Sequence, residues 1–353
     1  MKNLLLPKWL STTLLITAII SGLNVVAFGY LTARTAFSQP INPLTESAEE
    51  VAGVDLQLDQ DAPPAVPTMV VGESSPTPEP TTIPWRGTDR INILLMGIDR
   101  RPGEPFISRT DSMIVVSINP ETEKVSMLSV PRDLYVVLPG RGRDRINTAF
   151  VYGSTGNNPA GGAELAMQTV EYNLGISIDH YVLVDFSAVI NGVDLLGGVD
   201  VNVPYTINDP TYPNMNYGYD PLYIPAGLQH FDGSTALKYA RTRHQDTDFG
   251  RARRQQQLIL AVRDKAVALG IGNMLQQAPA LYQQLEQGIR TDLSVEQMIR
   301  LATTLSGIPA ENIHNEVLDQ RYVSGHVTAQ GAQVLILNNA VVAPLIQQMF
   351  YND

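Results

Sequence analysis

The sequence predicts an α/β fold of the αβα type, in which helices flank a mixed β-sheet. Short apolar runs with strand character alternate with helical stretches from Arg90 to Asp353. The chain has 353 residues, of which 44% are hydrophobic and 17% are charged, and this composition is typical of globular proteins. No internal repeat is evident. We therefore expect one domain over residues 90–353.

The first strands follow from apolar runs that are separated by turn residues. Ile91–Ile98 and Ser112–Ile118 are two such runs, and a turn that contains a proline, Asn119–Lys124, leads into a third, Val125–Val130. The second and third runs are therefore expected to form a hairpin. The sequence predicts two further strands, His180–Phe186 and Val199–Val203.

Helical spacing of apolar residues predicts the helices. Asp232 precedes one of them in the position of an N-terminal cap, and Pro344 is expected to break or kink the last one. The predicted helices are Ala163–Asn173, Ser187–Leu196, Asp232–Tyr239, Phe249–Leu269, Met274–Gln287, Val295–Ser306 and the region Ala329–Met349.

The N-terminal segment 1–36 is predicted to anchor the protein in a membrane. Its run Leu10–Thr32 has no charged residue and is long enough for a bilayer, which needs roughly 20 apolar residues. Lys2 and Lys8 precede the run, so the N-terminus is expected in the cytoplasm and the remainder outside it. A cleaved signal peptide remains an alternative, because small residues follow the run. In either case the folded domain is extracytoplasmic.

Residues 37–89 are predicted to form a disordered stalk, because they are rich in proline and poor in large apolar side chains. The stalk also contains most of the net charge of −11, since no Lys or Arg occurs between Arg34 and Arg86. The eight acidic residues between these two arginines are Glu46, Glu49, Glu50, Asp55, Asp59, Asp61, Glu73 and Glu79. The rest of the chain is close to neutral, so an acidic total does not exclude an anionic substrate.

Two carboxylates are candidate metal ligands. Asp99 directly follows the first predicted strand and Asp111 directly precedes the second, so neighbouring strands would bring both to one end of the sheet. Mg²⁺ prefers oxygen ligands and often takes only one or two protein carboxylates. The alternative is that both are ordinary turn residues at strand ends.

Arg132 is a candidate phosphate ligand. Pro131 stops strand pairing after Val130, so Arg132 leaves the sheet at its end. A surface ion pair between Arg132 and Asp133 is the alternative. Guanidinium groups bind phosphate oxygens in pairs, which makes an arginine at this place suited to a phosphate.

The strongest local signal is the arginine-rich stretch Ala240–Gln257. Arg241 and Arg243 are two residues apart in what the sequence suggests is an extended exit from a helix. Arg251, Arg254 and Gln255 share one face of the next helix. Cations near a helix N-terminus oppose the helix dipole, and a bound anion would resolve that conflict. A solvated basic face is the alternative.

Several enzyme classes lack support in the sequence. There is no cysteine, which excludes thiolate metal sites and cysteine nucleophiles. Neither a G-x-S-x-G elbow, nor an HExxH zinc motif, nor a Walker loop is present.

Five ordered motifs resemble the LytR-CpsA-Psr (LCP) family of membrane-anchored phosphotransferases. They are GID (Gly97–Asp99), RTDSM (Arg109–Met113), SVPRD (Ser129–Asp133), RIN (Arg145–Asn147) and RTRHxDxDFGRxxRQ (Arg241–Gln255). The resemblance implies that Asp99 and Asp111 bind Mg²⁺ (or Mn²⁺) and that an apolar tunnel holds a polyprenyl chain. It implies that the pyrophosphate is bound by Arg132, Arg145, Arg241, Arg243, Arg251, Arg254 and Gln255. Arg109 is a further candidate ligand, because it places a cation beside the same strand ends as Asp99 and Asp111. Arg145 departs from the family pattern, where lysine is commoner.

The resemblance also implies an activity. A glycopolymer on a polyprenyl-pyrophosphate carrier would be transferred to a hydroxyl of peptidoglycan, with Arg132, Asp133, Arg241 and Arg243 as catalytic residues. Hydrolysis of the carrier at the same site is one alternative. Nucleic-acid binding by the arginine-rich stretch is another alternative. It requires a cytoplasmic domain, which protease added to spheroplasts could not reach. Because we expect an extracytoplasmic domain, we expect no nucleic-acid partner.

Overall fold

The computed structural model describes residues 90–100, 104–214, 218–243, 247–270 and 285–352. The predicted anchor (1–36), the stalk (37–89) and nearly all of the predicted helix Met274–Gln287 lie outside these ranges. Within them, no helix has both the length and the apolar character that crossing a bilayer requires.

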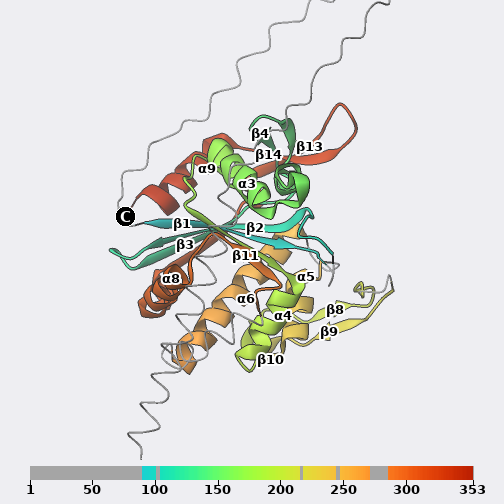
Figure 1. The fold of residues 1–353 in the computed structure, drawn as a ribbon. Helices are drawn as coiled ribbons and strands as arrows, with labels where there is room; N and C mark the ends of the chain where they lie inside the picture. Colours follow the sequence, from blue (N-terminus) through green and yellow to red (C-terminus); the bar gives the residue numbers. More distant parts are fainter. Residues whose placement is uncertain (1–89, 101–103, 215–217, 244–246, 271–284, 353) are drawn as a thin grey trace, which may run out of the picture. The chain divides into compact units, whose positions relative to one another are not determined.

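A six-stranded mixed sheet forms the centre of the fold (Figure 1). In spatial order its strands are β11 (Ile289–Thr291), β6 (His180–Asp185), β1 (Ile91–Ile98), β2 (Thr110–Asn119), β3 (Lys124–Ser129) and β12 (Ile313–Val317). The predicted hairpin is confirmed, because β2 pairs antiparallel with β3. β1 lies between β2, which runs antiparallel to it, and β6, which runs parallel.

Helices cover both faces of this sheet, which confirms the predicted αβα arrangement (Figure 1). The helices of one face are α2 (Ala149–Gly153), α3 (Pro159–Leu174) and α9 (Asn339–Ile346), and those of the other are α6 (Asp248–Leu269) and α8 (Val295–Gly307). Side chains of one strand alternate between the two faces. Leu94 and Met96 therefore pack with α3 and α9, whereas Ile93 and Leu95 pack with α6 and α8.

A smaller layer beside α6 has an apolar core of its own. Its elements are α4 (Phe186–Leu195), β7 (Val199–Val203), β8 (Ile207–Asp209), β9 (Leu222–Ile224), β10 (Gly227–Phe231) and α5 (Gly233–Arg241). The predicted strand β7 pairs with β10 and not with the central sheet. Asp232 caps α5 as predicted: it accepts a hydrogen bond from the Thr235 amide at 2.7 Å, and hydrogen bonding to Thr235 lowers the pKa of this carboxyl.

The C-terminal region corrects one prediction. The stretch Ala329–Met349 is not helical throughout, because Gln333–Leu337 forms strand β14, which pairs with β13 (Val323–Val327). Only α9 and the wide helical turn after it, Gln347–Tyr351, are helical, and Pro344 lies inside α9. Apolar content alone could not distinguish a strand from a helix here; the pairing with β13 decided it. A second hairpin that the sequence did not predict joins β4 (Tyr135–Leu138) and β5 (Gly142–Arg145).

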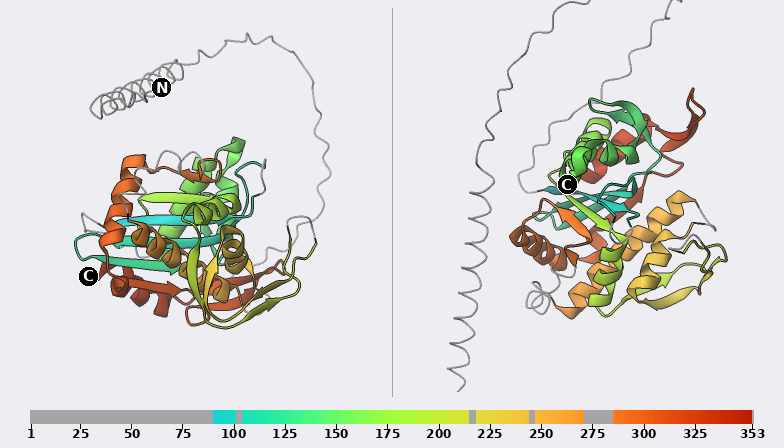
Figure 2. Two further views of the ribbon diagram at one scale, coloured as in Figure 1. Left: turned by 90° about the horizontal axis from the view of Figure 1, so that it is seen from below. Right: turned by 45° about the vertical axis from the view of Figure 1, so that its right-hand side comes forward.

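The hairpins β13–β14 and β8–β9 lie at the same end of the central sheet. β13–β14 lies on the side of α3 and α9, and β8–β9 lies on the side of α4 and α5 (Figures 1 and 2). The strand ends that carry the predicted site residues lie at this end of the sheet.

Candidate active site

The directions of the strands bring the predicted site residues to one edge of the sheet. β1 and β3 end at the edge where the antiparallel β2 begins. Asp99 follows β1, Asp111 is the second residue of β2, and Arg132 follows β3 after the turn at Pro131. The convergence that the sequence predicted for Asp99 and Asp111 is thus present, and Arg132 joins them. Ligands of open α/β sheets commonly bind at the carboxyl ends of the parallel strands.

A cavity of about 390 Å³ opens at this edge and extends between the sheet and helices α4, α5 and α6. Its charged and amide-bearing lining is Asp99, Asp111, Arg132, Asp185, Asp209, Arg241, Arg243, Arg251 and Gln255. Its aliphatic lining includes Leu95, Ile114, Val184, Val189, Leu237, Leu258 and Ile259. The cavity therefore combines a polar region at the strand ends with an apolar region beneath the sheet.

Arg132 lies among carboxylates. Its Nη1 donates to Oδ1 of Asp111 at 2.6 Å, and its Nε lies 3.2 Å from Oδ2 of Asp248 and 3.6 Å from Oδ2 of Asp133. Burial disfavours the charged guanidinium, but the hydrogen bond to Asp111 and the nearby negative charges raise the pKa of Arg132 above its ordinary value. Within the described residues its buried Nε has no hydrogen-bond acceptor. Arg132 thus stays charged, and three carboxylates hold its guanidinium in place.

Asp248, the first residue of α6, was missed by the sequence analysis. It forms ion pairs with Arg132, with Arg243 at 3.7 Å and with Arg251 at 3.6 Å. An acidic residue in the first turn of a long helix is favoured by the helix dipole, and that position was the available signal. Asp248 therefore orients three of the predicted phosphate ligands.

Arg251 is buried at the start of α6 and donates from Nη2 to the carbonyl oxygen of Asp111 at 3.2 Å. Burial lowers the pKa of this guanidinium, and Asp248 offsets part of the effect. Gln255, one turn further along α6, also lines the cavity. Both residues thus face the cavity, as the helical spacing predicted.

Arg241 and Arg243 line the mouth of the cavity from the end of α5. Arg241 is the last residue of the helix and not part of an extended exit, which corrects the prediction; the chain becomes extended at Thr242. Its guanidinium lies 4.2 Å from the ring centre of Phe186 and 3.4 Å from Oδ2 of Asp99. The aromatic contact holds the guanidinium at the mouth of the cavity.

Arg254 is placed differently from the other predicted ligands. It is buried and does not belong to the cavity lining. Its guanidinium donates to the carbonyl oxygen of Tyr239 at 2.9 Å and to that of Thr242, at the C-terminus of α5. The unfavourable position of the Arg254 charge near the N-terminus of α6 is therefore offset by the carbonyl groups at the end of α5. No bound anion is required to stabilise this guanidinium.

The remaining predicted residues lie around the cavity. Arg109 is exposed and does not line it. Arg145 forms an ion pair with Oδ1 of Asp133 at 3.2 Å and donates to the carbonyl oxygen of Gln333 at 2.8 Å. Asp133 lies between Arg132 and Arg145 and lines a second cleft beside the cavity.

The donor set at the strand ends suits a hard cation. Asp99 and Asp111 supply carboxylate oxygens that line the same cavity. In the described part of the chain, no group of three or more His, Cys, Asp or Glu side chains is arranged to hold a metal ion. Two carboxylates are sufficient for Mg²⁺, which usually completes its coordination with waters and substrate phosphates.

Comparisons with known proteins agree with the motifs. The model of the LytR_cpsA_psr family matches residues 66–350. The chain is 37% identical over 225 residues to a polyisoprenyl-teichoic acid–peptidoglycan teichoic acid transferase, TagU, of Oceanobacillus iheyensis. It is 31% identical over 227 residues to the transferase TagV of Bacillus subtilis. The matches cover 63% of this chain in both cases, 65% of the length of that TagU and 54% of TagV.

Solved structures share the fold. TagT bound to LI-WTA superimposes with a TM-score of 0.60 and 26% identity, over 77% of this chain and 96% of TagT. Bacillus subtilis TagV gives a TM-score of 0.58 and 26% identity, over 76% of this chain and 100% of TagV.

Proposed function

This chain belongs to the LytR-CpsA-Psr family, and on that premise we propose that it transfers a glycopolymer from a polyprenyl-pyrophosphate carrier to a hydroxyl of peptidoglycan. The observation that carries the proposal is the cavity with two regions. The arginines at its mouth can bind the oxygens of a pyrophosphate. Its aliphatic interior can bury part of the polyprenyl chain, which is the role expected of the apolar tunnel. The names of the TagU and TagV relatives and of the TagT complex support the same substrate class.

In the proposed reaction, the hydroxyl oxygen of the acceptor attacks the phosphorus next to the glycan. A new bond forms between this oxygen and phosphorus, and the bond from phosphorus to the bridging oxygen breaks. Polyprenyl phosphate leaves with the bridging oxygen, and the hydroxyl proton passes to Asp133. The product is a phosphodiester between glycan and peptidoglycan.

The side chains contribute position and charge. Four arginines that line the cavity place positive charge at the strand ends: Arg132, Arg241, Arg243 and Arg251. Phosphoryl transfer depends mainly on such positioning and on neutralising the phosphate oxygens. The acidic partners of these arginines keep the guanidinium groups oriented before substrate arrives, so little reorganisation is needed when phosphate replaces the carboxylates.

Lipid analysis and transfer assays test the function. We expect polyprenyl phosphate or its glycan-linked pyrophosphate to be found by mass spectrometry in lipids extracted from the purified full-length protein. With a lipid-linked glycan and peptidoglycan, the main product should be glycan joined covalently to peptidoglycan. Free phosphorylated glycan as the main product, with acceptor present, would instead establish a hydrolase.

We further propose that Mg²⁺ or Mn²⁺ binds at Asp99 and Asp111, where it would neutralise phosphate oxygens. Chelation with EDTA should lower transfer by at least about 10²-fold, and added Mg²⁺ should restore it. Asp99→Asn should raise the Mg²⁺ concentration that gives half-maximal rate. Asp264→Asn, an exposed acid on the distant part of α6, is the control and should leave that concentration unchanged. Full activity in EDTA would contradict the metal site.

The protein is proposed to act outside the cytoplasm as a single-pass membrane protein, because its substrates are a membrane lipid and the cell wall. The uncharged run Leu10–Thr32 and the lysines before it support this location and orientation. Cleavage of the domain by protease added to spheroplasts is the expected result.

A further inference from the structure

A second cleft, of about 560 Å³, opens beside the cavity. Its walls come from the segment after β3, from the first turn of α6 and from the β13–β14 hairpin. They consist of Pro131, Arg132, Asp133, Asp248, Phe249, Gly325, His326, Val327, Gln333, Val334 and Leu335. Arg132 lines both the cavity and this cleft, so the two spaces are adjacent at this residue.

The hairpin that forms one wall is fixed to the site by main-chain contacts. The amide of Leu335 donates to the carbonyl oxygen of Asp133 at 3.0 Å. Arg145 bonds the carbonyl oxygen of Gln333 and also pairs with Asp133. The hairpin wall of the cleft is therefore bonded to the segment that carries Arg132, and these bonds fix its position.

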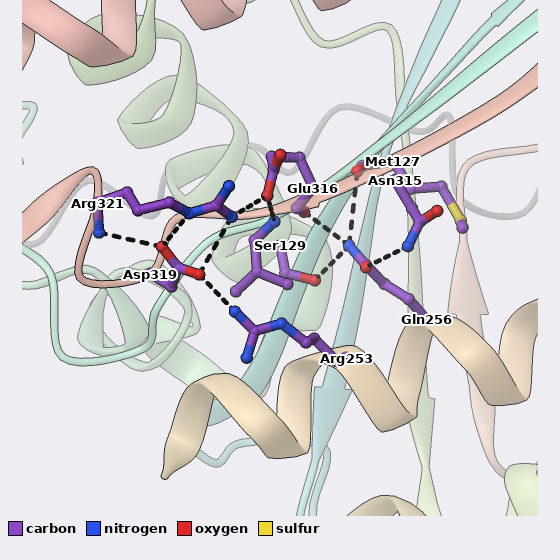
Figure 3. A network of polar contacts seen from close by, with 9 residues as sticks. Met127, Ser129, Arg253, Gln256, Asn315, Glu316, Asp319 and Arg321 are labelled. Atoms are coloured by element: carbon purple, nitrogen blue, oxygen red, sulfur yellow. Dashed lines mark hydrogen bonds and ion pairs between the residues drawn. The ribbon is translucent and has the colours of Figure 1, made fainter. Parts of the chain in front are cut away.

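A polar network around the buried carboxylate of Asp319 fixes the start of the same hairpin to α6 (Figure 3). Asp319, which is 2% exposed, accepts hydrogen bonds from Arg253 of α6 and from Arg321. The backbone carbonyl of Asp319 in turn accepts from the amide of Val323, the first residue of β13, at 3.0 Å. Burial opposes ionisation of Asp319, but its hydrogen bonds with Arg321 hold the pKa of the carboxyl below its ordinary value. The wall of the cleft is thus preformed.

The lining of the second cleft differs from that of the cavity. It contains a single arginine, Arg132, and two carboxylates, Asp133 and Asp248, that pair with it. The rest of the lining includes apolar side chains, such as Phe249 and the 60% exposed Val327, and the hydrogen-bonding groups of His326 and Gln333. Apolar surfaces interspersed with a few hydrogen-bonding groups suit an uncharged sugar, whose rings have apolar faces and hydroxyl edges. The lining does not suit a second polyanion.

The reaction geometry also requires a second space. In a phosphoryl transfer the attacking and leaving oxygens lie roughly in line on opposite sides of phosphorus. If the pyrophosphate lies in the cavity with Arg132 beside it, the acceptor must approach Arg132 from another direction. The second cleft provides that approach.

We propose that the cleft between the β13–β14 hairpin and the first turn of α6 binds the glycan strand of the acceptor and presents its hydroxyl group beside Arg132 and Asp133. This inference rests on the proposed function and assigns the acceptor to one place on the molecule.

Gly325 offers a direct test. A Cβ atom added at this residue would have no heavy atom within 4 Å, and Gly325 lines the cleft, so we expect the indole of Gly325→Trp to occupy the cleft. The matched control is Ser324→Trp, because Ser324 is an exposed residue of the same strand that does not line the cleft. Both variants of the full-length protein are assayed with lipid-linked glycan, with and without peptidoglycan, and wall-linked and free phosphorylated glycan are quantified.

We expect Gly325→Trp to lower transfer to peptidoglycan by at least about 10-fold, with a raised KM for the acceptor. Release of free glycan without acceptor should stay within about twofold of that of the unaltered protein. Ser324→Trp should behave as the unaltered protein does. If Gly325→Trp does not fold, His326→Ala provides the same comparison, with a raised acceptor KM expected.

Two outcomes would overturn the proposal. One is undiminished transfer by Gly325→Trp, and the other is an equal loss of transfer and of release without acceptor, which would place the donor and not the acceptor in the cleft. Failure of the proposed function is a separate result, because the unaltered protein would then give no wall-linked glycan at all.

Discussion

Replacing Arg132 by alanine is expected to reduce transfer by about 10³-fold while the protein remains folded. Arg132 lines both the cavity and the second cleft, and three carboxylates hold its guanidinium in place. Phosphoryl transfer builds charge on the phosphate oxygens, so removing a fixed cation beside them raises the barrier directly. The half-exposed carboxylates that surround Arg132 can be solvated after its removal, so the fold should tolerate the change.

The rate of glycan transfer and the midpoint of urea unfolding should be measured together for Arg132→Ala. Arg300→Ala is the matched control, because Arg300 is 79% exposed on α8 and pairs across one helical turn with the equally exposed Glu296. Its transfer rate should be unchanged and its free energy of unfolding should change by no more than about 0.5 kcal/mol. Turnover of Arg132→Ala at near the rate of the unaltered protein would contradict the role of Arg132 at the phosphate.

Arg254→Ala is expected to lower the free energy of unfolding by about 3 kcal/mol and to abolish transfer as a consequence. The Arg254 guanidinium is buried and bonds the carbonyl oxygens of Tyr239 and Thr242. Its removal leaves these oxygens without that donor in a site closed to water. It also loosens the junction between α5 and α6, from which Arg241 and Arg251 reach the cavity.

Urea unfolding of Arg254→Ala and Arg254→Lys separates this role from direct phosphate binding. Lysine keeps the charge but cannot bond both carbonyl groups with a planar fork, so both variants should be destabilised. Full stability of Arg254→Ala with loss of transfer would show that Arg254 acts on the substrate, as the sequence analysis predicted.

The central sheet and the principal helices could be predicted from local pattern. Continuous apolar runs identified β1, β2, β3 and β6, and helical spacing identified α3, α4, α5, α6 and α8. These elements bury whole runs or faces, so their hydrophobic pattern carries the information. β14 was mistaken for helix because a short apolar run fits both structures, and the short strands β8, β9 and β11 have too few residues to give a period.

The candidate site was predictable in its residue types but not in its partners. The motifs identified Arg132, Arg251 and Gln255, all of which line the cavity. They could not separate Arg254, which shares a helix face with Arg251 but reaches the end of α5. Asp248 was missed because its role depends on ion pairs that form in the folded chain. One of its three arginine partners, Arg132, is more than a hundred residues away in sequence.

The sequence by itself determined which chemistry is available: clustered arginines for an anion, two acids at strand ends for a cation, and a run of eight acids without a cation between Arg34 and Arg86 that accounts for much of the negative charge. Only the tertiary structure decided which arginine faces the cavity, which one joins two helices, and that a hairpin from the C-terminal region forms a second cleft beside Arg132. The physical reason is that residue type sets charge and hydrogen-bonding capacity, whereas partners depend on which segments, distant in sequence, pack against one another.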